Sequence, residues 1–121
     1  MRIEINNYRK IFGIQEEFNS FFPNLKIEFY EKPDNANRAP SKKLVKSSKT
    51  IAECRSVHNS GFITLLKGMT AGELKQNFAD VYSLSIDLFQ KTGNNTWSAT
   101  PVSDNAVLEE LNNTVEYFQS S

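Results

Sequence analysis

Two segments of the chain carry the same apolar pattern: IFGIQEEFNSFFPNLKIEFY at residues 11–30 and AGELKQNFADVYSLSIDLFQ at residues 71–90. In each segment, five apolar residues at helical spacing precede three apolar residues at strand spacing. The helical positions are Ile11, Ile14, Phe18, Phe21 and Phe22 in the first segment and Ala71, Leu74, Phe78, Val81 and Tyr82 in the second. A spacing near 3.6 residues predicts an amphipathic helix, and strict alternation predicts a half-buried strand. The sequence therefore predicts a helix–strand unit that occurs twice.

Extending the pattern outward gives two similar halves, at about residues 1–58 and 61–118. Each half is expected to run strand, helix, strand, an extended or loop segment, and helix. We expect an α+β fold in which these pseudo-symmetric repeats form one sheet with helices mainly on one face, and a ferredoxin-like layout is the nearest architecture. A half of about 60 residues would be marginally stable alone, so residues 1–121 should fold as a single domain around one shared core.

Composition narrows the classes of partner. Fourteen basic and fourteen acidic residues cancel, so net charge gives no reason to expect nucleic acid or an anionic membrane as a partner. The start of the chain has no apolar run of signal-peptide length, and no stretch is long enough to span a membrane. A single cysteine, Cys54, cannot form an intrachain disulfide. We therefore expect a cytoplasmic protein.

A family resemblance covers nearly the whole chain. The residues that carry it include Phe18, Phe21-Phe22-Pro23 and Leu25–Phe29 in the first half, and Gly68-Met69-Thr70, Glu73-Leu74, Phe78, Leu84, Phe89, Lys91-Thr92-Gly93 and Trp97 in the second. On these residues the chain resembles a family of small uncharacterised proteins from bacteria of the Bacteroidetes type. The resemblance implies a bacterial cytoplasmic origin. It implies no activity, cofactor or catalytic residue.

Three aromatic residues are the leading candidates for a binding surface. Tyr30 and Phe89 hold equivalent positions on the polar sides of the two alternating strands, and Trp97 lies on the segment that should return beside Phe89. If helices cover only one face of the sheet, these rings lie on its open side. Aromatic residues rimmed by polar ones are typical of protein-binding surfaces. The alternative is that the last helix or the long loop covers them.

A basic segment offers a second hypothesis. Residues 38–49 contain five basic residues and no acidic one: Arg38, Lys42, Lys43, Lys46 and Lys49. Such a loop can bind the phosphates of nucleic acids or of phosphorylated ligands through counterion release. It contains no aromatic residue on which a base could stack, and a solvated loop is often rich in lysine.

Cys54 and His58 offer a third hypothesis, a thiol enzyme. They are four residues apart, and the capping box Thr50–Glu53 predicts a short helix through about Val57 on which they would be neighbours. The structural interpretation is that Cys54 is a small buried apolar residue and that His58 is a cation at a helix end. No second Cys/His pair exists to complete a metal site, so we expect no metal and no cofactor. We favour a non-enzymatic module that binds a protein partner or a second copy of itself.

Overall fold

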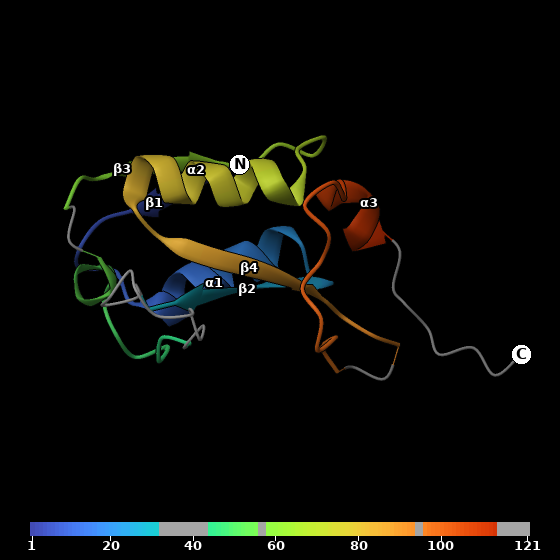
Figure 1. Cartoon of the computed structure of the whole chain (residues 1–121), viewed down its shortest axis with the longest axis horizontal. Helices are drawn as coiled ribbons and strands as arrows, with labels where there is room; N and C mark the ends of the chain where they lie inside the picture. The colour runs from blue at the N-terminus through green and yellow to red at the C-terminus, as the bar shows by residue number, and fades with distance from the viewer. Residues whose placement is uncertain (32–43, 56–57, 94–95, 114–121) are drawn as a thin grey trace, which may run out of the picture.

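The computed structural model describes residues 1–31, 44–55, 58–93 and 96–113. The elements in chain order are β1 (Arg2–Ile5), α1 (Ile11–Phe21), β2 (Leu25–Tyr30), the 3-10 helix η1 (Ile51–Cys54), β3 (Gly61–Thr64), α2 (Ala71–Tyr82), β4 (Ser85–Gln90) and α3 (Leu108–Asn113) (Figure 1). The predicted α+β class is confirmed. The first helix begins at the predicted residue and ends one residue early, before Pro23, whose ring cannot continue it.

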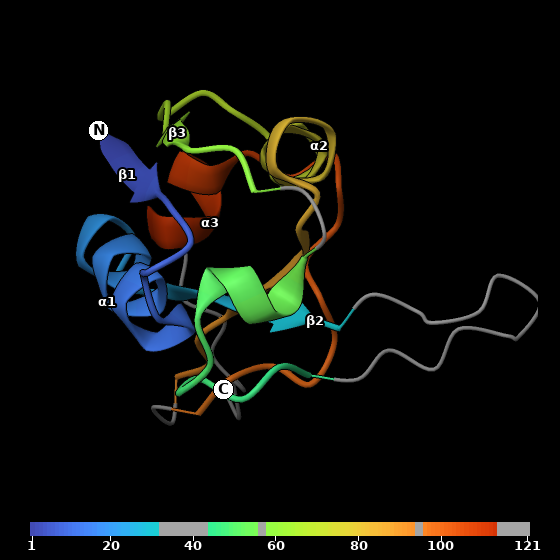
Figure 2. The ribbon, with the colours of Figure 1, turned by 90° about the vertical axis from the view of Figure 1, so that its left-hand side faces the viewer.

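The strands pair differently from the prediction. They form two separate two-stranded antiparallel ladders, β1 with β3 and β2 with β4, instead of one sheet. Figure 2 shows the two ladders on opposite sides of the core, with α1 and α2 on the two remaining sides. Among the described residues the two strands of one half do not pair with each other, so the expected single sheet is not formed, although two antiparallel ladders with helices stay consistent with a ferredoxin-like layout. Each strand takes its partner from the other half, and local alternation carries no information about that choice.

The register of both ladders is symmetric with respect to the two halves. In the β1–β3 ladder Ile3 lies opposite Ile63, which is the same position sixty residues later. In the β2–β4 ladder Glu28 lies opposite Asp87, and these residues also occupy equivalent places in the repeated pattern. The origin of the pattern by duplication stays a prediction, but exchanging the halves maps each ladder onto itself.

Backbone hydrogen bonds outside the ladders also come in corresponding pairs. The amide of Ile11 donates to Lys49 as that of Ala71 donates to Ala106, and the amide of Val45 donates to Phe29 as that of Val102 donates to Leu88. Val45 and Val102 therefore lie along the outer edges of β2 and β4 in the same way. Helix η1 follows residues 44–50 and helix α3 follows residues 96–107, and the two helices close opposite ends of the molecule (Figure 1).

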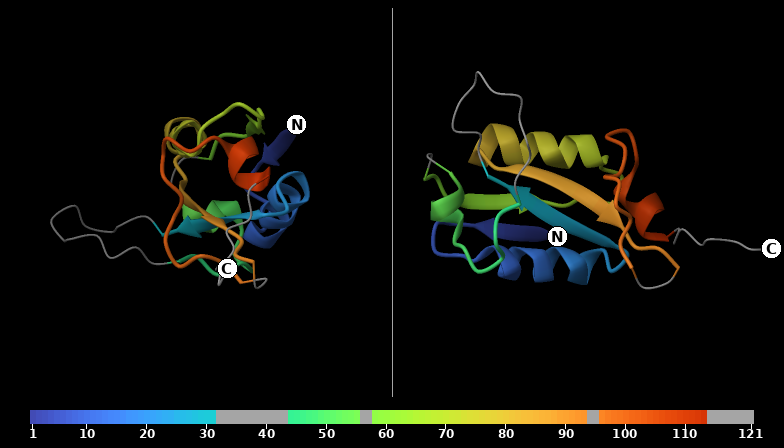
Figure 3. Two further views of the ribbon diagram at one scale, coloured as in Figure 1. Left: turned by 90° about the vertical axis from the view of Figure 1, so that its right-hand side faces the viewer. Right: turned by 60° about the horizontal axis from the view of Figure 1, so that its bottom comes forward.

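The core is built from the predicted apolar positions. Leu25, Ile27 and Phe29 of β2 and Ile86 and Leu88 of β4 are buried and face inward. Phe29 meets Phe78 of α2 edge to face, with ring centroids 5.7 Å apart. Because both halves supply this core, neither half has a core of its own. Helices α1 and α2 flank the strands from opposite sides in the right-hand view of Figure 3.

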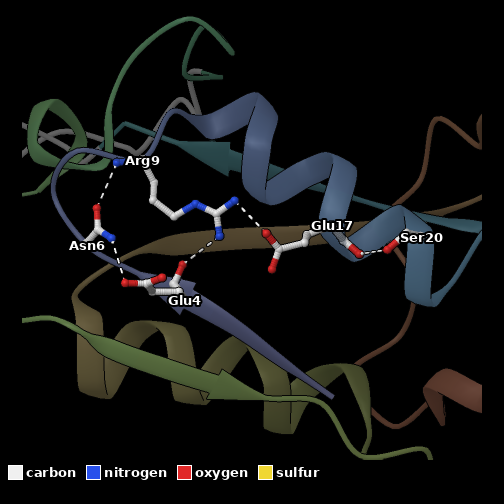
Figure 4. A network of polar contacts seen from close by, with 5 residues as sticks. All are labelled: Glu4, Asn6, Arg9, Glu17 and Ser20. Atoms are coloured by element: carbon white, nitrogen blue, oxygen red, sulfur yellow. Dashed lines mark hydrogen bonds and ion pairs between the residues drawn. The ribbon is translucent and has the colours of Figure 1, made fainter.

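Side chains cap the outer edges of the β1–β3 ladder. The Arg9 guanidinium donates to the carbonyl of Glu4 at 3.1 Å and to the carboxylate of Glu17 at 2.7 Å, which joins β1 to α1 (Figure 4). On the other strand, the Tyr82 hydroxyl of α2 donates to the carbonyl of Phe62 at 3.1 Å. Edge carbonyls that accept side-chain donors are less open to pairing with another chain.

Candidate functional site

The three predicted aromatic residues gather around one hollow on the outer face of the β2–β4 ladder. The hollow, hereafter the sheet hollow, has a volume of about 590 Å³ and is lined by Tyr30, Phe89 and Trp97 together with Leu44 and Pro101. All three rings are half-buried, neither fully open nor covered. Trp97 reaches this face because its residue bridges to Lys91, just beyond the end of β4.

Lysine side chains lie over the rings of this hollow. The Lys26 ammonium is 5.6 Å from the centroid of Phe89 and 5.5 Å from that of Trp97. Lys91 lies 5.7 Å from the Trp97 centroid on the same hairpin. These distances fall within the range of cation–π attraction. The hollow therefore presents aromatic surface and positive charge together.

A buried carboxylate lies at the centre of the ladder. Asp87 is 2% exposed, although its position alternates with the core residues of β4. The Lys75 ammonium of α2 approaches its Oδ1 to 3.0 Å and the exposed Asp104 carboxylate to 3.0 Å. Burial alone would lower the pKa of Lys75, but hydrogen bonds to Asp87 and Asp104 reverse this, so the pKa is raised. Lys75 is thereby held in its charged form.

Tyr30 joins the buried carboxylate to the hollow. Its pKa is raised by burial, then by the charge of Asp87 and by its hydrogen bond to that side chain. The phenol is therefore a neutral donor to Asp87 across a wide pH range. It forms a chain of contacts from the sheet hollow through Asp87 to Lys75.

A second cavity, the α2 cleft, lies beside helix α2. It has a volume of about 420 Å³, and Tyr30, Lys75 and Asp104 supply polar groups to its wall. Cys54 also lines it, although the residue is only 8% exposed. Tyr30 therefore belongs to both cavities.

The geometry around Cys54 favours the structural interpretation. Its Sγ donates to the carbonyl of Thr50 at 3.3 Å, and burial raises the pKa of the thiol. The predicted capping box is present, but it starts only one 3-10 turn, because Arg55 is already extended. The expectation that Cys54 and His58 share a helix is therefore wrong, and Val57 lies outside the described residues. His58 is exposed.

The basic segment borders the aromatic surface. Leu44 lines the sheet hollow, and Ser47 lines a smaller groove that also contains Trp97 and Lys26. Lys46 is exposed and Lys49 is half-buried. Arg38, Lys42 and Lys43 lie outside the described residues. Leu44 and Ser47 thus lie beside Trp97, an aromatic residue of the kind that residues 38–49 lack.

Sequence reasoning missed the charged residues of this region. Lys26, Lys75, Asp87 and Asp104 each occur in a pattern typical of a solvated surface. The signal that could have found Asp87 is its equivalence to Glu28, because a symmetric ladder places the two opposite each other.

Comparison of the chain with protein-family models, curated proteins and solved structures finds no match in any of the three. The resemblance to a bacterial family therefore stays a prediction. Within the described residues, no helix is long and apolar enough to cross a membrane. Over the same part of the chain, no three His, Cys, Asp or Glu side chains are grouped as a metal site would need.

Proposed function

We propose that the chain is a non-enzymatic protein-interaction module that associates with a second copy of itself through the sheet hollow. The observation that carries this proposal is the grouping of Tyr30, Phe89 and Trp97 around one concave surface. Half-buried aromatic rings contribute large contact areas at small entropic cost, and they are enriched where proteins bind each other.

Charge complementarity favours a second copy as the partner. The hollow carries the ammonium groups of Lys26 and Lys91 over its rings. Its own carboxylates are paired, since Glu28 lies 3.3 Å from Lys26 and Asp87 lies 3.0 Å from Lys75. Because Lys26 already pairs with Glu28, Lys91 is the cation that we expect to meet an incoming carboxylate. The chain also has an acidic surface of opposite sign.

That acidic surface lies at α3 and the segment before it. Residues 98–113 contain three acidic residues and no basic one: Asp104, Glu109 and Glu110. All three are exposed. A second copy can therefore place an acidic helix against Lys91, which lies over the Trp97 ring, with apolar contacts to the rings of the hollow. Such charge pairs set orientation and partner choice more than they set affinity.

Sedimentation velocity at tens of micromolar tests this proposal. The wild type should form a complex of two chains, and the variant Phe89→Ser/Trp97→Ser should be monomeric. Tyr8→Ser is the matched control, because Tyr8 is 91% exposed on the turn before α1 and lies outside the hollow. A monomeric wild type, or an unchanged complex in the double variant, would end the self-association proposal.

A charge-exchange experiment tests the orientation. The variant Glu109→Lys/Glu110→Lys should weaken association, and so should Lys91→Glu. Mixing the two variants should restore a complex that neither forms alone. Failure of the mixture to associate would refute the pairing of α3 with the hollow, whatever the wild type does.

Nucleic acid is the second candidate partner, favoured by the position of Leu44 and Ser47 beside Trp97. Single-stranded binders combine positive charge with rings on which bases stack. Titration with a fluorescent oligonucleotide should then show affinity that falls steeply with salt, by a slope of about −0.7 per phosphate neutralised on a single strand. At a fixed salt concentration, Trp97→Ser should lower the affinity for the oligonucleotide. An absence of binding at low salt would remove this candidate.

A further inference from the structure

The α2 cleft has a counterpart in the other half of the molecule. A groove beside α1 is lined by residues at the equivalent positions, and its volume is about 280 Å³, against about 420 Å³ for the α2 cleft. The two cavities flank the β2–β4 ladder on opposite sides, α1 beside β2 and α2 beside β4. Because the backbone positions around the two cavities are equivalent, their differences in volume and charge come from the side chains.

The rim residues explain the difference in volume. Where the α1 groove has Phe12 and Asn19, the α2 cleft has Gly72 and Ala79 at the same helical positions. Gly72 also allows close approach of the chain, since an added Cβ would lie 2.9 Å from the carbonyl oxygen of Asp104. Of these two cavities, the α2 cleft reaches the size of typical small-ligand sites, roughly 300 Å³ and above, and the α1 groove does not.

The charged residues of the two cavities also differ. Gln15 and Ser47 of the α1 groove are neutral where the α2 cleft has Lys75 and Asp104, and the charges of the α1 groove come instead from Glu16, Lys26 and Glu28. Gln15 donates to Glu28 at 3.0 Å, as Lys75 pairs with Asp87 at 3.0 Å. The Lys75 ammonium lies between Asp104, which lines the α2 cleft, and Asp87, which lines the sheet hollow, so these three groups together carry one negative charge in excess. The Asp104 side chain is 65% exposed, so this excess charge is accessible at the rim.

We propose that the α2 cleft binds a primary amine on a short alkyl chain. The ligand's ammonium group would pair with Asp104 at the rim, and its alkyl stem would lie over Ala79. An anionic ligand is disfavoured, because the cation that it would need, Lys75, already has a carboxylate on either side. This site is tested separately from the proposed self-association, although Tyr30 lines both cavities and Asp104 also belongs to the acidic surface assigned to the partner contact.

Two sources could supply this chemistry: a free alkylamine, or the lysine side chain of another protein. NMR titration of the ¹⁵N-labelled full chain with pentylamine tests the site, with pentan-1-ol and pentanoate as neutral and anionic probes of the same length. Pentylamine should shift the amides of Gly72, Lys75 and Ala79 saturably, and the other two probes should not. Tighter binding of N-acetyl-lysine methylamide than of pentylamine would assign the site to a partner's lysine, and equal or weaker binding would assign it to a free amine.

Variants separate the site from nonspecific attraction. Asp104→Asn should weaken pentylamine binding about fivefold, the effect of one exposed ion pair. Ala79→Leu should fill the cleft and abolish the shifts; Ala79 is exposed, so the fold should survive, as circular dichroism would check. Asn19→Leu in the α1 groove is the matched control and should leave binding unchanged. Absence of saturable shifts with pentylamine, or equal binding of pentanoate or pentan-1-ol, would overturn the proposal.

Discussion

Removing the ammonium group of Lys75 should destabilise the protein more than removing that of any other surface lysine. Asp87 has a side chain that is 3% exposed, and Lys75 approaches it to 3.0 Å. In Lys75→Met the aliphatic stem remains, so the loss comes mainly from the charge. The Asp87 carboxylate would stay buried with the Tyr30 hydroxyl as its remaining named donor.

The magnitude follows from burial. Removing one partner of a fully buried ion pair costs about 3–5 kcal/mol. The Lys75 side chain is 29% exposed, so water can partly replace its ammonium group, and we expect a smaller cost, about 2–3 kcal/mol. Substituting Asp87→Leu as well removes the stranded charge. The double variant should therefore be less destabilised than the sum of the two single variants, by about 1–2 kcal/mol.

Equilibrium unfolding in urea measures these free energies. Trp97 fluorescence and far-ultraviolet circular dichroism should give coincident transitions with one slope, which licenses a two-state treatment. Lys67→Met is the control, because Lys67 is exposed, and its change should stay within about 0.5 kcal/mol. If Lys75→Met costs no more than this control, or the two substitutions prove additive, the reasoning about Asp87 is refuted.

Three further outcomes are expected. The pKa of Lys75 is raised by folding, so its contribution to stability is complete below its pKa in the unfolded chain and is lost as the pH rises through its pKa in the folded chain. The melting temperature should therefore fall above about pH 10, and it should fall less in Lys75→Met. Gly61→Ala should cost about 1–3 kcal/mol in urea unfolding, because its Cβ would collide with the Tyr82 hydroxyl, whereas Gly68→Ala, with open space around it, should be neutral or slightly stabilising. Iodoacetamide should alkylate Cys54 slowly until urea unfolds the chain, since burial raises the pKa of its thiol; rapid native alkylation, seen by mass spectrometry, would contradict this.

Local patterns predicted the elements because each pattern reports a local cause. The capping box at Thr70 is present, with Glu73 donating its amide to the threonine hydroxyl at 3.1 Å and accepting from the Thr70 amide at 2.8 Å. The same pattern at Thr50 gave only η1, because Arg55 leaves the helix and its guanidinium turns inward to the carbonyl of Tyr82. That contact joins residues 27 positions apart, and no local pattern reports it.

The candidate site likewise combines features that local patterns predict and features that depend on distant contacts. The sequence could place Tyr30 and Phe89 on the same face of the sheet, because equivalent positions in two alternating strands lie on one face of a ladder. The burial of Asp87 could not be predicted from the sequence, because an aspartate between two core residues of a strand is usually solvated. It is buried here because Lys75 of α2 reaches over the edge of β4 to neutralise it.

The sheet hollow and the α2 cleft share a wall, so binding in one cavity can affect binding in the other. Tyr30 lines both the sheet hollow and the α2 cleft, and its hydroxyl is hydrogen-bonded to Asp87. Asp87 in turn shares the Lys75 ammonium with Asp104, the rim carboxylate of the cleft. A ligand that draws Asp104 away from Lys75 leaves that ammonium to Asp87 alone, which changes the field around the Tyr30 hydroxyl. Because linkage between two sites is reciprocal, any factor by which a cleft ligand alters binding at the hollow must also apply in the other direction.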